Sequence, residues 1–353
     1  MTTQGTYGDV LFRSANSGAL GTKAAARLLY DAKKRMMLMR WATQEDLPQK
    51  SGQTIQWRRY HNIDTGLNPI LGDENPSATK ISWTDFTSTL YRFGGVADIP
   101  EHMQLLHEDD LVMVASNLLS YDMYRKLETL AYNTVKAGSN AIYANGAASR
   151  SAITSVMTEN DLEYAISILE ENNAEEITEL VTSSPDYLTY PIQPSYVGYG
   201  HSNIAPVIRN MNSFVGVEHY AGQTAIMPGE IGTIANKIRV VCSNIALPWE
   251  GVGGDPSTNG VRGLSSSAHV YPFCIFAKDS FAVSKLSGMN STRVMIKPPA
   301  SNGDSFDKLG LKGHIGYKTW FGSTILQNDY LVRVETAVPA YTSARQDLAG
   351  PDF

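Results

Sequence analysis

The chain has 353 residues, which at roughly 150 residues per domain predicts two or three structural units. Only 18% of its residues are charged, against about 25% in an average soluble domain, and 42% are hydrophobic. A chain of this composition can bury a large core, which excludes an intrinsically disordered protein. No run approaches the roughly 18 consecutive apolar residues of a membrane span. The first residues lack a basic stretch followed by an apolar one, so neither a secretion signal nor a membrane partner is expected.

Charge is unevenly distributed along the chain. Residues 1–60 contain ten Lys and Arg and four Asp and Glu, a net +6, so the remaining residues must sum to -12 for the total of -6. A basic beginning on an acidic body predicts a partner for the basic part.

The first elements expected in chain order are an arm and a helix. Residues 1–21 are rich in Gly, Ser, Asn and Thr and predict an extended arm. Residues 22–41 are dense in helix formers and predict an amphipathic helix that ends before Pro48. The polar face of this helix is basic, with Arg27, Lys33, Lys34, Arg35 and Arg40.

A long hairpin is expected next. Residues 53–63 and 81–93 are rich in β-formers, and the segment 64–76 between them is rich in Gly, Pro, Asn and Asp. Neither face of this hairpin is an obvious core face, and an isolated hairpin is marginal in water. We therefore expect it to lie on another part of the chain or on a neighbouring subunit.

Helices and short strands follow. With Asp98 as its cap and Pro100 in its first turn, a helix over 100–137 would span about 57 Å if unbroken. A second amphipathic helix is expected over 158–172, with Leu162, Ala165, Ile166 and Leu169 facing inward. Strands are expected at 237–242, 270–276, 293–296, 315–326 and 330–338.

No chemical motif indicates an enzyme. The glycine-rich run at 251–254 favours a surface loop over a phosphate site, because no strand–turn–helix pattern surrounds it. Cys242 and Cys274 lie in apolar contexts that favour buried free thiols. A helix start facing solvent is favoured over a metal site for the cluster His102, His107, Glu108, Asp109 and Asp110. No catalytic, cofactor-binding or metal-binding residue is therefore expected.

The order of these parts resembles the α+β subunit of a Hong Kong 97-type capsid from tailed double-stranded-DNA phages. Two segments carry the resemblance: 220–241, with GEIG before a strand, and 307–334, with GHIGYKTW and then YLVRV. They are similar to the major capsid protein family named after coliphage N-four. The resemblance implies an N-terminal arm and helix (1–50), an extended hairpin loop (51–97), a peripheral domain with a long spine helix (98–184), an axial domain (185–305), returning peripheral strands (306–340) and a C-terminal tail (341–353).

The resemblance also implies partners. Hexamers and pentamers of the chain would close into an icosahedral virion capsid around packaged double-stranded DNA, assembled in the host bacterial cytoplasm. A separate scaffolding protein, a portal and a decoration protein are the other implied partners. The inner-surface or arm contact candidates are the five basic residues of the 22–41 helix. The inter-subunit contact candidates are Trp57, Arg58, Arg59, Tyr60, Leu67, Ile70, Lys80 and Trp83.

Some relatives of this fold crosslink their subunits through a hairpin lysine. Lys80 is the only lysine within 53–97 and so the only candidate, although nothing around it in the sequence supports that chemistry.

Three alternatives stay open at this point. The first is an encapsulin-like shell of the same fold that holds protein cargo. The second is a two-domain enzyme with a cleft near 251–267, for which the sequence shows no convergent acid and base residues. The third is a sequence-specific nucleic-acid-binding module, which the net charge of -6 disfavours.

Overall fold

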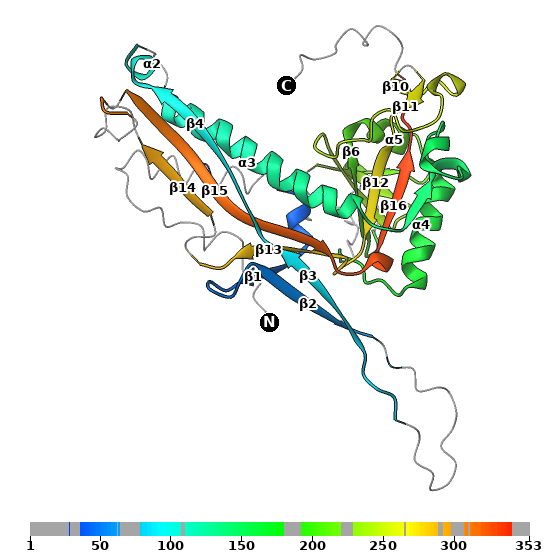
Figure 1. The fold of residues 1–353 in the computed structure, drawn as a ribbon. Coiled ribbons are helices and arrows are strands. Elements are labelled where there is room, and N and C mark those ends of the chain that lie inside the picture. Colours follow the sequence, from blue (N-terminus) through cyan, green and yellow to red (C-terminus); the bar gives the residue numbers. More distant parts are fainter. Residues whose placement is uncertain are drawn as a thin grey trace.

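The computed structural model describes residue 28 and residues 36–61, 63, 78–106, 110–179, 192–219, 229–264, 266–288, 292–297, 307–309 and 311–340. These residues form a rounded part around one sheet, an elongated part built on a second sheet and a long helix, and a projecting hairpin (Figure 1).

A seven-stranded mixed sheet forms the rounded part. Parallel pairs occur between β5 and β16 and between β6 and β9, and the other neighbours are antiparallel. All residues of β12 and β16 are buried, which fits strands covered on both faces. The strand order is β5 (Ala141–Tyr143), β16 (Leu331–Thr336), β12 (Tyr271–Phe276), β6 (Tyr196–His201), β9 (Ile238–Ser243), β8 (Glu230–Ile234) and β7 (Val215–Gly216).

Different helices cover the two faces of this sheet. On one face Phe273 and Ile275 join a core cluster with the apolar side of α4 (Glu159–Glu171). On the other face Cys274 and Phe276 pack in a cluster with α3 (Leu111–Lys136). Because side chains alternate along a strand, β12 supplies both cores at once.

Two glycines in β6 make room for a side chain of β12. A Cβ on Gly198 would lie 2.4 Å from Cζ of the buried Phe273 ring, and one on Gly200 would lie 2.7 Å from its Cδ2. The Phe273 ring therefore occupies the space above β6 that two side chains would otherwise fill.

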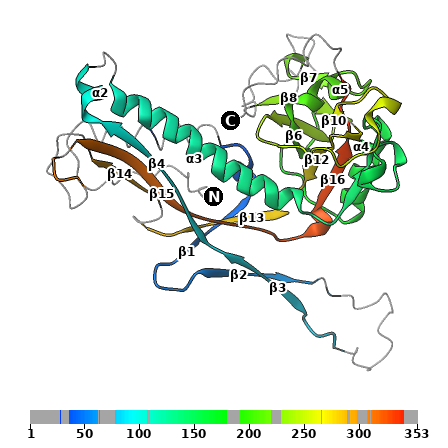
Figure 2. The ribbon, with the colours of Figure 1, turned by 45° about the horizontal axis from the view of Figure 1, so that its top comes forward.

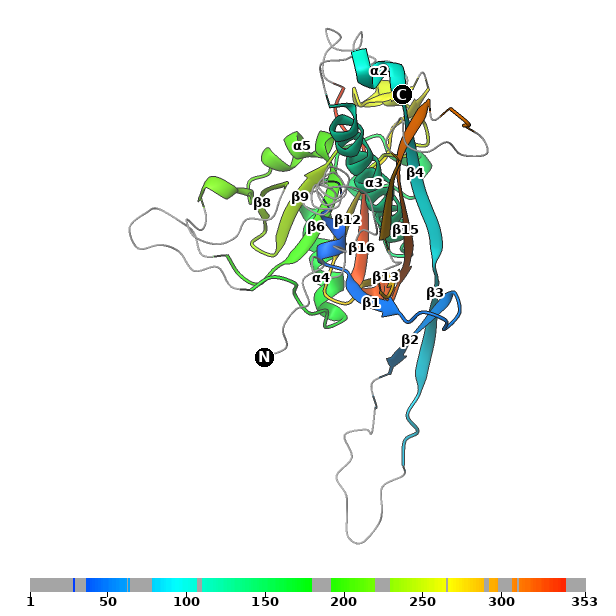
Figure 3. The ribbon, with the colours of Figure 1, turned by 90° about the vertical axis from the view of Figure 1, so that its left-hand side faces the viewer.

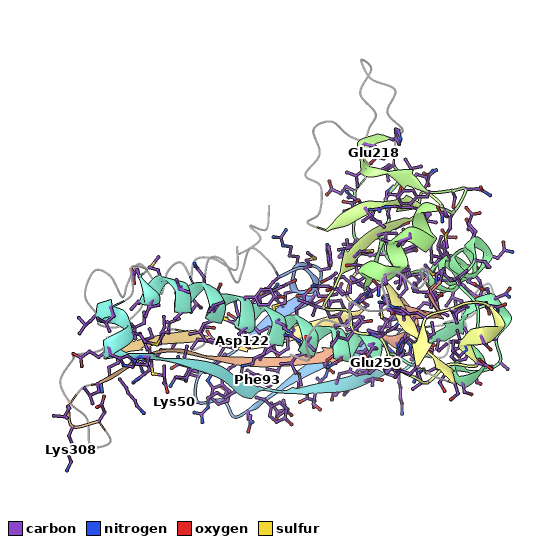
Figure 4. The ribbon with its side chains drawn as sticks, turned by 90° about the horizontal axis from the view of Figure 1, so that it is seen from above. Lys50, Phe93, Asp122, Glu218, Glu250 and Lys308 are labelled. Atoms are coloured by element: carbon purple, nitrogen blue, oxygen red, sulfur yellow. The ribbon has the colours of Figure 1, made fainter. Side chains whose placement is uncertain are left out.

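The elongated part is a five-stranded sheet with α3 lying across it (Figure 2). The Tyr317 hydroxyl donates to Asp122 Oδ2 at 2.7 Å, and Lys126 Nζ donates to the carbonyl oxygen of Gly94 at 3.1 Å, which fastens α3 to the strands. Figure 4 labels Asp122 on α3 beside Phe93 on the sheet. The strand order is β1 (Thr43–Leu47), β13 (Phe281–Leu286), β15 (Lys312–Ile325) and β14 (Thr292–Lys297), with β4 (Tyr91–Pro100) also paired to β15.

The expected helix over 100–137 is two helices, α2 (Glu101–Leu106) and α3. Asp110 caps α3 by accepting from the backbone N–H groups of Val112 and Met113. The expected cap, Asp98, is instead a strand residue paired with His314, because β4 stays on β15 as far as Pro100.

The expected second hairpin strand, 81–93, is also divided. β2 (Thr54–Tyr60) pairs only with β3 (Trp83–Thr89) among the described strands, and β4 begins at Tyr91 on the five-stranded sheet. Leu90 separates β3 from β4, buried in a cluster with Leu47 and Ile55. Figure 3 shows β3 continuing the line of β4 away from the body.

Other expected elements are confirmed. Helix α4 begins at Thr158 with a capping box to Asp161, and Leu162, Ala165, Ile166 and Leu169 are buried as expected. β9, β12, β14, β15 and β16 match the five strands predicted over 237–338. The remaining short α-helix and strands are α5 (Ala205–Arg209), β10 (Gly263–Leu264) and β11 (Ser267–Ala268), and seven 3-10 helices of three residues each occur within the described residues.

Sheet membership crosses the residue ranges taken from the sequence. β13 and β14 lie within 185–305 but pair in the five-stranded sheet. β16 lies within 306–340 but pairs in the seven-stranded sheet, as does β5 from the range 98–184. The chain therefore passes several times between the two sheets.

Candidate interaction surfaces

One face of the β2–β3 hairpin presents aromatic and charged side chains to solvent. Tyr60 is 62% exposed and Trp83 51% exposed, and their rings meet edge to face at 6.3 Å between centroids. The Arg58 guanidinium lies 5.1 Å from the centre of the Trp83 ring and pairs with Asp85 at 2.8 Å. The hydrogen bond from Arg58 lowers the pKa of Asp85. The outer face, as we call these four residues, thus presents Tyr, Trp and Arg, the residue types enriched in binding hot spots.

The opposite face of the hairpin turns toward the body. Ile55 is buried with Leu47 and Leu90, and Trp57 packs against this cluster. Further along the hairpin from its base, the Arg59 guanidinium lies 5.5 Å from the centre of the Phe86 ring. Only the base of the hairpin is anchored in a core, so its described outer half depends on pairing between two strands.

A groove of about 550 Å³ lies between the hairpin and the body. The pair formed by Lys278 Nζ and Glu175 Oε2, 2.7 Å apart, lies among its lining residues, and the hydrogen bond from Lys278 lowers the pKa of Glu175. The buried Trp57 Nε1 has no hydrogen-bond partner among the described residues. The residues that the hairpin contributes to the groove are Trp57, Arg58, Arg59, Tyr60, His61 and Phe86, and those that the body contributes are Asn173, Glu175, Lys278, Asp279, Leu326, Gln327, Asp329 and Tyr330.

A second exposed surface lies at the far end of the elongated part. Leu105 and Leu106 of α2 are 75% and 84% exposed, and Leu309 and Leu311 are also exposed. The Glu101 N–H donates to the Leu311 carbonyl oxygen at 2.8 Å, which brings the two segments together. Figure 4 labels Lys308 at this end of the molecule. We call these four leucines the tip patch; the sequence signal that could have revealed it is the pair of short apolar runs at 103–106 and 309–311.

The structure brings several predicted contact residues together on the hairpin. Trp57, Arg58, Arg59, Tyr60 and Trp83 lie on the paired strands, and Lys80 is exposed just before β3. Arg40 is exposed at the end of a single 3-10 turn, Leu38–Arg40, rather than on a continuous helix to residue 41. Leu67, Ile70, Arg27, Lys33, Lys34 and Arg35 lie outside the described residues.

A closed ion network occupies the buried edge of the seven-stranded sheet. The fully buried Glu335 accepts from Arg150 at 2.6 and 2.7 Å and from Arg333 at 2.8 Å. The Arg150 guanidinium also stacks 3.8 Å from the centre of the Trp249 ring. Every charged oxygen of this carboxylate has a donor, so the network fits a structural role.

The remaining chemical candidates within the described residues give no reactive arrangement, and His107, Glu108 and Asp109 lie outside those residues. Both cysteines are free, and burial raises the pKa of each thiol to about 12, which keeps them protonated. Among the described residues, no three His, Cys, Asp or Glu side chains are grouped to hold a metal ion. None of the described helices is long and apolar enough to cross a membrane.

A projecting hairpin, a long helix across a five-stranded sheet and a rounded seven-stranded unit together define the Hong Kong 97-type fold, as expected from the sequence. Among solved structures, the chain is similar to the capsid of Ralstonia phage GP4, with a TM-score of 0.62 and 10% identity over 88% of this chain and 93% of that one. It is also similar to the head structure of Helicobacter pylori bacteriophage KHP40, with a TM-score of 0.53 and 14% identity over 84% and 87% of the two chains. The capsid of Cyanophage P-SCSP1u matches with a TM-score of 0.52 and 14% identity over 86% and 87%. No protein-family model matches the sequence, and neither does any curated protein.

Proposed function

We propose that this chain is the major capsid protein of a tailed double-stranded-DNA bacteriophage, related to the family named after coliphage N-four. It acts without catalysis, by binding other copies of itself. The observation that carries this proposal is the hairpin, whose outer face leaves Tyr60 and Trp83 exposed on a two-stranded ribbon that has a core only at its base. Solved phage capsid and head chains share the fold across most of this chain, which supports the same conclusion.

The shape of the chain suits a shell subunit. The hairpin of one copy lies on the body of the next, so donor and acceptor surfaces differ and the contact is heterologous. Heterologous contacts generate rings when the rotation closes, here the hexamers and pentamers of an icosahedral shell. The five-stranded sheet with α3 serves as the peripheral domain and the seven-stranded sheet with α4 as the axial domain.

The basic residues near the N-terminus have a separate role. Arg27, Lys33, Lys34, Arg35 and Arg40 contact packaged DNA or a neighbour's acidic surface without reading base sequence, so the contact weakens with salt. Assembly takes place in the host bacterial cytoplasm with a separate scaffolding protein and a portal, and a decoration protein can bind the finished shell.

Sedimentation of the purified chain with its scaffolding partner tests self-assembly. We expect rings or shells, and a persistent monomer under all assembly conditions would contradict the proposal. Nuclease-protected DNA in particles from infected cells separates a phage capsid from a shell that holds protein cargo.

Shortening the hairpin segment 64–76 tests how the subunits join. We expect particle formation to fail while the circular dichroism spectrum and unfolding midpoint of the subunit stay unchanged, because the hairpin residues that join a core, Ile55 and Trp57, lie at its base. A shortened chain that still assembles with full yield, or that fails to fold, would contradict this role for the hairpin.

A further inference from the structure

Glu128 is a carboxylic acid buried in the middle of α3, on the face that packs against the rest of the chain. Its side chain is completely shielded from solvent. Glu128 Oε1 accepts from the Leu38 N–H at 3.0 Å and from the Tyr199 hydroxyl at 3.2 Å. Glu128 Oε2 accepts from the Met37 N–H at 3.3 Å. One side chain therefore connects the spine helix, the N-terminal segment 36–40 and strand β6 of the seven-stranded sheet.

The N-terminal segment needs this acceptor. Its 3-10 turn begins at Leu38, and its own N-cap residue, Met37, offers no side-chain oxygen to the first backbone donors. Met36, Leu38 and Met39 are buried in the same core cluster as Leu127. The apolar side chains of the segment thus fill a gap beside α3 while Glu128 satisfies its backbone.

The surroundings of Glu128 hold little other charge. Arg40, from the N-terminal segment, favours the ionised carboxylate electrostatically. Burial raises the pKa of Tyr199 on β6 and of Tyr132 on α3, so both phenols stay neutral. Tyr132 lies with its ring 5.7 Å from that of Tyr199, and the thiol of Cys274 on β12, which acts electrostatically on Tyr132, is also neutral. Tyr124 also acts electrostatically on Tyr199.

We propose that Glu128 is a proton-controlled latch that holds residues 36–40 on α3 and the seven-stranded sheet when its carboxyl group is neutral and releases them as it ionises. A neutral carboxyl can still accept the two backbone N–H groups, and it can donate its own proton to the Tyr199 oxygen. An ionised carboxylate at this buried position is not hydrated, which raises its free energy. Release of the segment lets water hydrate the carboxylate again. The segment follows Lys33, Lys34 and Arg35 directly in sequence.

The direction of the pH effect follows from the pKa in the two states. When residues 36–40 lie on α3, which we call the docked state, burial raises the pKa of Glu128 from 4.5 to about 7, although the three hydrogen-bond donors favour the ionised form. A group with a raised pKa stabilises the docked state fully below pH 4.5 and loses that contribution as the pH rises through about 7. The difference between the two pKa values limits the fall in the docking equilibrium constant to about 300-fold.

Hydrogen exchange of the full-length chain, measured by mass spectrometry from pH 5 to pH 8.5, tests the latch. After correction for the intrinsic exchange rate, protection of the peptide over residues 36–40 should fall by roughly 70-fold across this range. The α4 peptide, Glu159–Glu171, serves as an internal control that should not change. Protection of 36–40 that does not depend on pH in the unmodified chain would overturn the proposal, and this result requires no variant to fold.

Three variants identify the titrating group. Glu128→Gln fixes the side chain as neutral, so protection of 36–40 should become independent of pH. Tyr199→Phe removes a donor that favours the ionised form, so the midpoint of the fall should move to higher pH. Asp122→Asn alters another carboxylate of α3, which contacts Tyr317 and Lys126 rather than the segment, and should leave the fall intact. A fall that persists in Glu128→Gln, or a midpoint that does not move in Tyr199→Phe, would assign the pH dependence to another group and overturn the latch.

Discussion

The hairpin and the seven-stranded sheet use the same kinds of contact at opposite degrees of burial. In the hairpin, an edge-to-face pair of rings, Tyr60 and Trp83, and an ion pair, Arg58 with Asp85, lie open to solvent. In the body, Phe276 meets Phe281 edge to face at 5.3 Å inside the core. Glu335 holds two arginines there with no exposure of its own.

This difference in burial separates the contacts that stabilise the folded subunit from the contacts that are available for association. Buried rings and buried ion pairs stabilise the subunit, since breaking them leaves cavities or unpaired charges. Exposed rings and exposed ion pairs contribute little to folding. Exposed Tyr and Trp rings are nevertheless the kind of group that binds a partner strongly once water is removed from them. Under the proposed function, the exposed contacts of the hairpin serve a second copy, whereas the buried contacts of the body stabilise the subunit itself.

The largest expected effect comes from breaking the buried network. In Glu335→Ala, Arg333 and Arg150 lose their shared carboxylate, and Arg333 is left largely buried without a counter-charge. We expect the free energy of unfolding of the subunit, measured with urea, to fall by about 3–5 kcal/mol. The matched control is Glu175→Gln, which breaks the exposed pair with Lys278 and should leave the urea midpoint unchanged. Equal effects of the two variants would remove the distinction between buried and exposed pairs.

The next effect concerns association, and it rests on the proposed function. Tyr60→Ala and Trp83→Ala remove exposed rings from the outer face, so the free energy of unfolding should change by less than about 0.5 kcal/mol. Subunit association, measured by sedimentation, should weaken by about 30-fold, as for a hot spot of about 2 kcal/mol. Tyr164→Ala on the exposed side of α4, where the ring is 60% exposed, is the matched control and should assemble normally. Normal assembly of both hairpin variants would contradict the role of the outer face.

The sequence predicted elements whose signals are local. Helix α4 was predictable because Thr158 and Asp161 form its capping box and its apolar residues keep helical spacing. The division of 81–93 into β3 and β4 was not predictable, because it depends on β15, more than 200 residues later, as the partner of β4. The β content of 91–100 gives no indication of which strand it will pair with.

The candidate site was predicted in part for the same reason. Aromatic and basic residues around 57–60 and at 83 indicated a contact surface, but the grouping of four of its side chains on one face depends on the register Arg58–Asp85 and Tyr60–Trp83. Glu128 was missed, although a signal existed: it is an acid on the apolar side of α3, next to Leu127 and one turn before Ala131. An acid at such a position requires buried donors, which here come from residues 37 and 38 and from β6, both distant in sequence.

The smallest effect is local to the hairpin and depends on pH. Because Arg58 lowers the pKa of Asp85 below 3.8, the ion pair stabilises the hairpin above that pH and loses its contribution as the pH falls through the lowered pKa. Both side chains are exposed, so Asp85→Asn should leave the thermal midpoint of the subunit unchanged and should only speed hydrogen exchange of β2 and β3. In the unmodified chain, exchange of these strands should approach that of Asp85→Asn as the pH is lowered below 3.8, while the exchange of β12 stays slow. If Asp85→Asn instead lowered the thermal midpoint as Glu335→Ala does, the hairpin would belong to the folding core, and its exposed rings could not be reserved for a second copy.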